Sequence, residues 1–258
     1  MADSLHITLV QAPIVWENRN ENLARFGALI RRMSGKTNVV ALPEMFSTGF
    51  SMNVEALADT TDGTTVQTLH TWAKEHQTAV TGSFMAKEEN RYYNRAFFIT
   101  PQGDAFYYNK RHLFSMAGED KYFTPGTQQT IVSYLGWNIC LQVCYDLRFP
   151  VWSRNVNKAY DLLIYIANWP EIRIGAWNAL LPARAVENLA YVCAVNRTGK
   201  DKGEYGGHSV VYSPKGEKII DAGAEPEIIL SATLHKEQLE NIRTHFPTWK
   251  DADTFILQ

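Results

Sequence analysis

The sequence predicts an α/β fold of four layers, in which two β-sheets pack face to face between outer layers of helices. Short apolar runs that suit strands alternate with segments of helical spacing, a pattern typical of α/β proteins. This order occurs once before Cys144 and is loosely repeated after it, which indicates two similar halves. Each half ends in a hairpin with a strand–Pro-x-Gly–strand pattern, around Pro101 and Pro214. Two sheets with helices on one side would bury their bare faces against each other, giving an α-β-β-α sandwich.

The elements of the first half are predicted from periodicity and from the residues that end them. Apolar residues alternate in the first strand, and Pro43 stops the second. The hairpin turns on the sequence PQGD, which has the residue types that turns prefer. In chain order we expect a strand at 5–10, a helix at 22–33, a strand at 39–42, a helix at 66–76, a strand at 79–85 and a hairpin of 92–100 with 105–109.

The second half is predicted in the same way, and its hairpin turns on the sequence SPKG. No Pro/Gly/Ser-rich linker separates the halves, so we expect a single domain over 1–258. The tail from about 233 has no strong pattern besides a helical piece at 236–243. It should pack on the domain or on a partner subunit, because Phe246, Trp249 and Phe255 need apolar surroundings. In chain order we expect a strand at 139–143, a helix at 151–157, a strand at 162–167, a helix at 177–188, a strand at 190–195 and a hairpin over 210–220.

Composition restricts the class of partner. The chain has 258 residues, of which 45% are hydrophobic and 20% charged, so it can bury a large core. Its net charge of −2 offers neither a broad basic field for nucleic acid nor a polybasic patch for a membrane. No stretch is apolar for the roughly 18 residues that a membrane span requires. A small molecule is therefore the expected partner.

The three cysteines indicate a reducing environment. Three cysteines in this length do not make a disulfide framework, and no histidine cluster with metal-ligand spacing accompanies them. We therefore expect no metal and place Cys140 and Cys193 in the core. The N-terminal sequence lacks the basic start and long apolar run of a signal peptide, so the cytoplasm is the expected compartment.

Cys144 lies where an expected strand gives way to an expected helix. Pro150 suits the first turn of that helix, and backbone N–H groups at a helix start favour a thiolate over a thiol. Cys144 is therefore a candidate nucleophile. The alternative is a buried structural cysteine, because free cysteines are among the most buried residues.

Glu44 and Lys110 also lie just past expected strands, and strand ends from neighbouring strands converge on one edge of a sheet. Taken singly, each could be an ordinary turn or surface charge. Together with Cys144 they supply a base, a cation and a nucleophile. Attack of a thiolate on an amide needs a base to take the thiol proton and donors to stabilise the oxyanion, here Lys110 and the backbone N–H of Tyr145.

The sequence around these residues resembles the nitrilase (carbon–nitrogen hydrolase) superfamily, whose Glu-Lys-Cys motifs are similar to LPEMF, YNKRHLF and VCYDLRFP. The similarity runs from Ile7 to about Phe255 and includes ANWP, WNALLPARAVENLAYV, GGHSVVYSPKGE and FPTWKDADTF. The flanking residues are most similar to the bacterial omega-amidase branch. This resemblance implies hydrolysis of the terminal amide of 2-oxoglutaramate or 2-oxosuccinamate, the sandwich fold predicted above, a homodimer or larger assembly, and no metal or organic cofactor.

The resemblance also implies roles for individual residues. Glu44 is similar to the general base of the family, Lys110 to its oxyanion-stabilising cation and Cys144 to its nucleophile. The family has a second glutamate that orients the lysine. Glu119 in SMAGED is the candidate here, with Asp120 as the alternative. Glu119 could instead be an ordinary loop carboxylate exposed to solvent.

An omega-amidase must also hold a carboxylate of its substrate, and the forked guanidinium of arginine does this well. The candidates are Arg173 and Arg148, although Arg148 is as consistent with a structural role. Phe46, Phe50 and Trp169 are candidates for the walls of a small pocket, with core packing as the alternative.

Two other functions stay open at this point. One is a different branch of the same superfamily, such as a nitrilase, a carbamoylase or an amidase for another acyl group, because these share the three residues. The other is a non-catalytic binding protein on this fold, which we would expect to have lost one of Glu44, Lys110 or Cys144.

Overall fold

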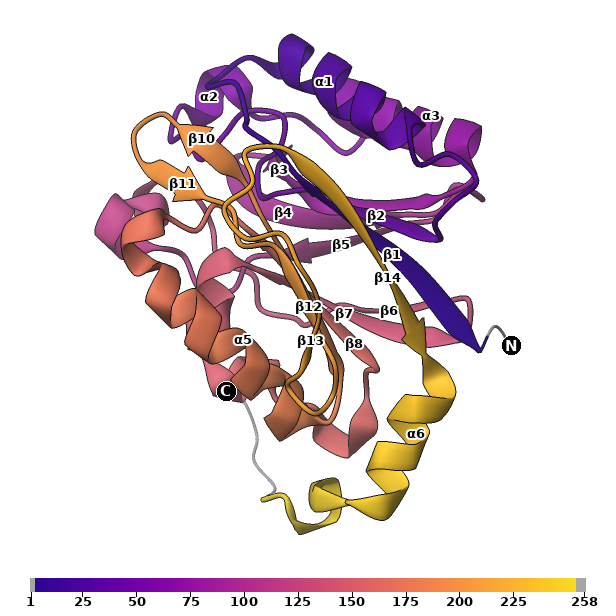
Figure 1. Ribbon diagram of the computed structural model, residues 1–258. Helices are drawn as coiled ribbons and strands as arrows, with labels where there is room; N and C mark the ends of the chain where they lie inside the picture. Colours follow the sequence, from indigo (N-terminus) through magenta and orange to yellow (C-terminus); the bar gives the residue numbers. More distant parts are fainter. Residues whose placement is uncertain (1–2, 254–258) are drawn as a thin grey trace.

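The computed structural model describes residues 3–253, which form two six-stranded sheets between outer helices (Figure 1). The first sheet has the strand order β14-β1-β2-β3-β4-β5 and the second β13-β12-β9-β8-β7-β6. The strands of the first sheet are β1 (Ser4–Gln11), β2 (Val39–Ala41), β3 (Ala79–Glu88), β4 (Arg91–Ile99), β5 (Ala105–Asn109) and β14 (Ile228–His235). Those of the second are β6 (Ile131–Tyr134), β7 (Trp137–Val143), β8 (Leu162–Ala167), β9 (Tyr191–Asn196), β12 (Val210–Tyr212) and β13 (Lys218–Asp221).

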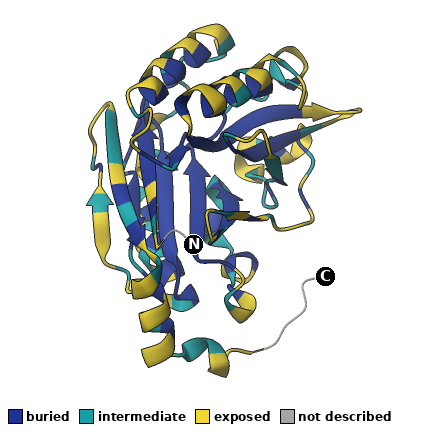
Figure 2. Ribbon diagram, turned by 90° about the vertical axis from the view of Figure 1, so that its right-hand side faces the viewer, coloured by how far each residue is buried: buried dark blue, intermediate teal, exposed yellow. Residues whose placement is uncertain are grey.

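The four-layer prediction is confirmed. Helices α1 (Arg19–Arg31) and α3 (Thr64–His76) cover the outer face of the first sheet, and α5 (Ile174–Asn188) covers the outer face of the second (Figure 1). The inner faces of the sheets share one apolar core, to which Leu9, Ala96, Leu141 and Ile164 contribute. Figure 2 shows the result: the central strands are buried, while some edge strands are partly exposed and the outer helices expose one side.

The strands at the centre of each sheet are parallel. β1, β2 and β3 run parallel in the first sheet, and β7, β8 and β9 in the second. The carboxyl ends of parallel strands therefore lie along one edge of each sheet, where α/β proteins place their sites. The hairpins β4–β5 and β12–β13 add antiparallel strands, as the Pro-x-Gly patterns predict.

The tail was predicted incompletely, because it begins with a strand. All eight residues of β14 pair antiparallel with β1, so a late segment completes the first sheet. Helix α6 (Lys236–His245) follows as predicted and buries Leu239 and Arg243 against the domain. Phe246 stays 66% exposed, and the Lys158 ammonium lies 4.3 Å from the centre of the Trp249 ring. Phe255 lies outside the described residues.

The helix expected over 151–157 is wrong. Helix α4 covers Pro150–Ser153 only, and Arg154 already has an extended conformation. The Asn155 side chain explains the break, because its Nδ2 donates to the Tyr160 carbonyl at 2.9 Å and its Oδ1 accepts from the Tyr160 N–H at 3.1 Å. Such bonds between side chain and backbone compete with helical bonds.

None of the helices within residues 3–253 combines the length and the hydrophobicity of a membrane span. Short elements complete the fold. The short elements are α2 (Val54–Leu57), the small hairpin β10 (Thr198–Lys200) with β11 (Glu204–Gly206), and the 3₁₀ turns Ser115–Ala117, Glu119–Lys121, Cys144–Arg148, Val156–Lys158, Glu171–Arg173 and Thr248–Asp251.

Candidate active site

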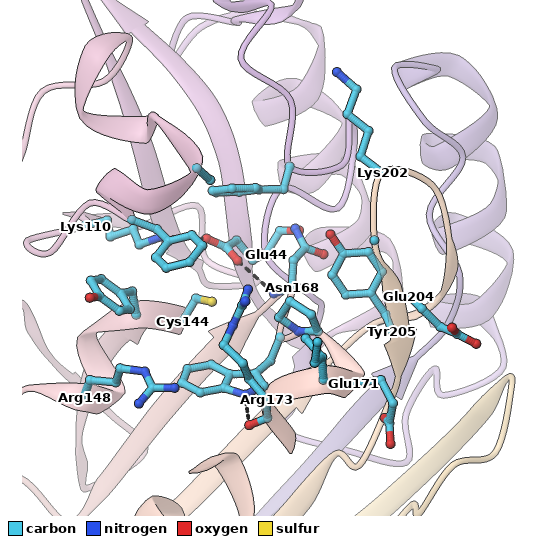
Figure 3. A pocket seen from close by; sticks show the side chains of 18 of the residues that line it. Glu44, Lys110, Cys144, Arg148, Asn168, Glu171, Arg173, Lys202, Glu204 and Tyr205 are labelled. Carbon is cyan, nitrogen blue, oxygen red and sulfur yellow. Dashed lines mark hydrogen bonds and ion pairs between the residues drawn. The ribbon is translucent and has the colours of Figure 1, made fainter. Parts of the chain in front are cut away.

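The structure brings Glu44, Lys110 and Cys144 together on one cavity of about 790 Å³ (Figure 3). Glu44 lies in the turn after β2, Lys110 directly follows β5, and Cys144 directly follows β7, so the two sheets contribute to one site. The volume is typical of a pocket for a small molecule. Other residues that line it are Phe50, Phe114, Tyr145, Arg148, Asn168, Trp169, Arg173 and Tyr205.

Lys110 lies between two carboxylates in a fully buried cluster. Its Nζ is 3.0 Å from Glu44 Oε1 and 3.1 and 2.9 Å from the two oxygens of Glu119. Burial alone would lower the pKa of Lys110, but the carboxylates of Glu119 and Glu44 outweigh burial and raise it, so Lys110 is a cation. Burial raises the pKa of Glu119, and the Lys110 ammonium opposes that rise. Of the two alternatives, Glu119 therefore contacts the lysine, while Asp120 is exposed.

Asn94 on β4 bridges the two carboxylates and was missed by the sequence reasoning. Its Nδ2 donates to Glu44 Oε1 at 2.7 Å and to Glu119 Oε1 at 3.0 Å. Asn94 is completely buried. The signal was an asparagine between the aromatic and apolar residues of the strand sequence RYYNRAFFI, because a buried amide requires hydrogen-bond partners.

The chain turns sharply at Cys144. Its φ of 46° lies in the left-handed region, which is unfavourable for a residue with a Cβ. The turn is closed by the Val143 N–H, which donates to Asp146 Oδ2 at 3.0 Å. This geometry leaves Cys144 partly exposed on the cavity wall, with its sulfur directed into the cavity (Figure 3).

Contrary to the sequence prediction, Cys144 does not lie at the N-terminus of an α-helix. The segment after Cys144 is a five-residue 3₁₀ turn and not an α-helix. Burial and then the Glu44 carboxylate raise the pKa of the Cys144 thiol well above its usual value, and Lys110 opposes the rise. The resting sulfur is therefore a thiol, and it needs a base before it can attack.

Asp146 joins the cysteine turn to the lysine loop. Besides the Val143 N–H, it accepts the Tyr108 hydroxyl at 2.7 Å and the His112 backbone N–H at 3.0 Å. The His112 ring also contacts Asp146, with Nδ1 at 2.8 Å from Oδ1. Since Tyr108 and His112 flank Lys110, this buried carboxylate fixes the cysteine turn relative to the lysine. The sequence reasoning named Asp146 in a motif but gave it no role.

Asn168 joins the first sheet to the second at Glu44. The Asn168 backbone N–H donates to Glu44 Oε2 at 2.8 Å, and its side chain donates to the Glu44 carbonyl at 2.9 Å. Asn168 directly follows β8 of the second sheet. The Glu44 side chain is therefore held from both sheets, which leaves it little freedom to move.

Two guanidinium groups line the cavity without an ion pair to any residue in the described part of the chain. Arg173 extends toward Cys144 and Glu44, and its Cζ lies 5.0 Å from the centre of the Phe114 ring (Figure 3). Arg148 also lines the cavity, and its Cζ lies 5.2 Å from the centre of the Trp169 ring (Figure 3). Both could donate hydrogen bonds to a substrate carboxylate, and Arg173 is the better placed because it extends toward Cys144.

Of the three predicted wall residues, Phe50 and Trp169 line the cavity and Phe46 does not. The prediction that Phe46 lines the pocket is wrong. Its side chain is completely buried in the core outside the first sheet, with its ring centre 5.5 Å from that of Phe26 and 5.9 Å from that of Phe97. The loop turns at Met45, which has a φ of 45°, and Phe50 reaches the cavity as predicted.

Tyr205 on β11 is a further lining residue that the sequence reasoning missed. Its ring lies 4.4 Å from the Arg197 Cζ, and its hydroxyl points toward Asn168 (Figure 3). Burial raises the pKa of Tyr205 to about 12, so this hydroxyl stays protonated and can donate a hydrogen bond. The strands that carry it are too short for periodicity to predict.

The donor set does not suit a metal. Within residues 3–253, no group of three or more His, Cys, Asp and Glu side chains could hold a metal ion. Cys140 and Cys193 are buried, as predicted, and burial raises the pKa of both thiols.

Known proteins are similar to this chain over nearly its whole length. The family described as carbon-nitrogen hydrolase matches residues 6–244. An omega-amidase (YafV) of Escherichia coli is 42% identical over 98% of both chains, and a 2-oxoglutaramate amidase of Bacillus subtilis is 32% identical over 95% of this chain and 96% of that one. A crystal structure of a CN-hydrolase superfamily protein from Xanthomonas campestris, with an arsenic adduct in its active site, has a TM-score of 0.95 at 39% identity and covers 99% of both chains.

The extent of these matches agrees with the fold and with the convergence of Glu44, Lys110 and Cys144 on one cavity. The chain belongs to the carbon–nitrogen hydrolase family, the nitrilase superfamily, and is a hydrolase of carbon–nitrogen bonds other than peptide bonds.

Proposed function

We propose that this protein is an omega-amidase that hydrolyses the terminal amide of 2-oxoglutaramate or 2-oxosuccinamate to the 2-oxo dicarboxylic acid and ammonia. The observation that carries the proposal is the position of Arg173, a guanidinium with no ion pair to any residue of 3–253, in the same cavity as Cys144, Glu44 and Lys110. A substrate with a carboxylate at one end and an amide at the other matches that pair of features. The omega-amidase and 2-oxoglutaramate amidase among the relatives support this substrate class.

The first half of the reaction forms a thioester. Glu44 takes the proton of the Cys144 thiol, and the sulfur attacks the amide carbon. The carbonyl oxygen becomes an oxyanion, which Lys110 and the Tyr145 backbone N–H stabilise. One Lys110 hydrogen can be shared between the two Glu119 oxygens, at 3.1 and 2.9 Å, which leaves another for the oxyanion. The carbon–nitrogen bond then breaks, and Glu44 gives its proton to the leaving ammonia.

The second half hydrolyses the thioester. Water enters the position left by ammonia, and Glu44 takes one of its protons as the oxygen attacks the thioester carbon. The carbon–sulfur bond breaks, and the proton returns to the Cys144 sulfur. The products are the free carboxylic acid and the resting thiol. In this scheme Glu119 orients Lys110 and does not exchange protons.

Substrate binding rests on the residues at the other end of the cavity. Arg173 is proposed to hold the substrate carboxylate, with Arg148 as a second cation on the wall. The aromatic rings of Trp169 and Phe50 would pack against the short carbon chain of the substrate.

The test is ammonia release from 2-oxoglutaramate, glutamine, a simple nitrile and an N-carbamoyl amino acid, with the parent protein and Cys144→Ala. We expect fast turnover of the 2-oxo amide alone and its loss in Cys144→Ala. Cysteine-dependent activity on another compound would keep the mechanism and discard the omega-amidase assignment. Absence of activity on all four would favour a binding protein, and ammonia release by Cys144→Ala at the parental rate would refute the mechanism.

We also propose that the chain folds as a single domain, works in the cytoplasm and assembles into a homodimer. The core shared by both sheets supports a single domain, and the superfamily resemblance supports the dimer. Sedimentation equilibrium tests the assembly: twice the chain mass is expected, and a monomer at micromolar concentration would contradict it.

A further inference from the structure

We infer that Asn94 is a positioning residue that gives the two chemically identical carboxylates of the site different tasks. By donating to one oxygen of each, it leaves a single vacant acceptor position in the Glu44–Glu119 pair, on Glu44 Oε2. The inference rests on the proposed function, because it specifies where the base of that mechanism receives its proton.

The carboxylate of Glu119 is saturated with donors. A carboxylate oxygen offers about two acceptor positions. Glu119 Oε1 accepts from Asn94 Nδ2 at 3.0 Å and from Lys110 Nζ at 3.1 Å. Glu119 Oε2 accepts from Lys110 Nζ at 2.9 Å and from the Phe114 backbone N–H at 2.6 Å. A proton could join Glu119 only by displacing one of these donors, so Glu119 cannot easily serve as the base.

Glu44 has one position left. Its Oε1 accepts from Asn94 Nδ2 at 2.7 Å and from Lys110 Nζ at 3.0 Å. Its Oε2 accepts from the Asn168 backbone N–H at 2.8 Å, the contact drawn as a dashed line in Figure 3. The second acceptor position on Oε2 has no protein donor within the described chain. The proton of Cys144 is therefore received on Oε2.

The direction of the Asn94 amide is fixed by Ser83. The Met45 N–H donates to Ser83 Oγ at 2.8 Å, and the Ser83 hydroxyl donates to Asn94 Oδ1 at 3.0 Å. If the amide flipped, its oxygen would face the oxygens of Glu44 and Glu119, which is unfavourable. The amide nitrogen consequently keeps both hydrogens on the carboxylates.

Asn94 is also tied to Lys110 through the backbone. The Lys110 N–H donates to the Asn94 carbonyl at 2.9 Å, and Asn94 pairs with Met85 in the β3–β4 ladder. One residue in the first sheet therefore sets the position of the cation by its main chain and of both carboxylates by its side chain. Its effect on the chemistry is exerted through Glu44 and Glu119, because Asn94 itself does not line the cavity.

The test compares Asn94→Asp with Ser83→Ala and with Asn155→Asp, a matched control. Asn94→Asp is nearly isosteric, but it replaces two donors with a third carboxylate. Ser83→Ala keeps Asn94 and removes the donor that orients it. Asn155 is another buried asparagine whose Nδ2 donates to two acceptors, the carbonyls of Tyr160 and Asn188, remote from the cluster. The Asn155→Asp variant therefore shows how much the burial of an additional carboxylate alone disturbs the structure.

The readout is the rate at which iodoacetamide alkylates Cys144 as a function of pH, followed by peptide mass spectrometry. This measurement needs no substrate, so it stays informative if the omega-amidase assignment fails. We expect Asn94→Asp to move the midpoint of the profile upward by about one pH unit, which is roughly a tenfold slower reaction near neutral pH. Ser83→Ala should give a smaller shift in the same direction, and Asn155→Asp none.

Two results would overturn the inference. One is a profile of Asn94→Asp that superimposes on that of the parent. The other is an equal shift in Asn155→Asp, which would show that the effect is a general loss of structure. If Asn94→Asp does not fold, Ser83→Ala carries the test, and an unchanged profile for that variant would refute the proposed locking of the amide.

Discussion

Replacing Lys110 with methionine should destabilise the protein strongly and in a pH-dependent way. Methionine keeps the length of the side chain but removes the only charge that separates the two buried carboxylates in the described cluster, with which Nζ makes contacts of 2.9 to 3.1 Å. For two unit charges 3.0 Å apart, Coulomb's law gives about 5 kcal/mol at an effective dielectric constant of about 20. Desolvation offsets part of this, and removing one partner of a buried ion pair costs about 3–5 kcal/mol.

The sign of the pH dependence follows from Glu119. Its pKa is raised in the folded protein, so the folded state binds more protons than the unfolded chain once the pH exceeds the unfolded value of about 4.3. Stability from this group is therefore lost as the pH rises through the folded pKa. Lys110 limits the rise in the Glu119 pKa, so its removal should increase the stability that is lost as the pH rises. The deficit of Lys110→Met relative to the parent should be larger at about pH 8 than at about pH 5.

The assay is urea unfolding of parent and variant at both pH values, with Lys218→Met as the control. Lys218 also pairs with a carboxylate, Asp221 at 2.5 Å, but its side chain is 53% exposed, so its loss should change the free energy of unfolding by less than about 1 kcal/mol. Adding Glu119→Gln to Lys110→Met should restore part of the lost stability, because it removes an unpaired carboxylate. A deficit below about 1 kcal/mol for Lys110→Met, or one that is the same at both pH values, would refute the reasoning.

Three further predictions concern the cavity. Arg173→Gln should lower kcat/KM for 2-oxoglutaramate by about 10- to 100-fold, because a charge-assisted contact to the carboxylate is lost; Arg148→Gln should have a smaller effect, and an equal effect on an amide without a carboxylate would contradict the assignment. Cys144→Gly should unfold about 1 kcal/mol less readily than Cys144→Ala, because glycine tolerates the positive φ at this turn; equal stability in calorimetry would argue against strain there. Iodoacetamide should label Cys144 with a rate that increases into the alkaline range and leave Cys140 and Cys193 unlabelled in the folded protein, because the pKa of the Cys144 thiol is raised and the other two are buried; pH-independent labelling of Cys144 would show a resting thiolate.

The three central residues were predictable from sequence for a physical reason. Glu44, Lys110 and Cys144 each lie just past a strand, and the carboxyl ends of neighbouring strands converge in space. The alternation of strands and helices and the two Pro-x-Gly hairpins likewise predict the two sheets and their outer helices. These are local patterns, which a single sequence carries in full.

Other features depend on contacts between distant segments. β14 pairs with β1, more than 200 positions away, and its partly exposed residues give a weak pattern of their own. Glu119 lies in a loop of 3₁₀ turns, where neither burial nor the choice against Asp120 can be deduced from periodicity. Asn94 acts through Ser83 on the neighbouring strand, so its importance is apparent only once β3 and β4 are paired.

Loop geometry accounts for the remaining errors. Phe46 enters the core and Phe50 enters the cavity because the backbone turns at Met45, a residue type for which a positive φ is uncommon. The short helix that begins at Pro150 ends because the Asn155 side chain forms hydrogen bonds with the backbone of Tyr160. Both outcomes depend on tertiary contacts that override local preference.

The central claim, that Cys144 forms a thioester with a 2-oxo acid amide, is tested most directly by mass spectrometry of acid-quenched enzyme. The protein is mixed with excess 2-oxoglutaramate, quenched within the first turnovers and digested. The account predicts a peptide containing Cys144 that carries the 2-oxoglutaryl group, that disappears as substrate is consumed, and that does not form in Cys144→Ala. Rapid release of ammonia by the parent with no acyl group on Cys144 at any quench time, together with retained activity in Cys144→Ala, would contradict it.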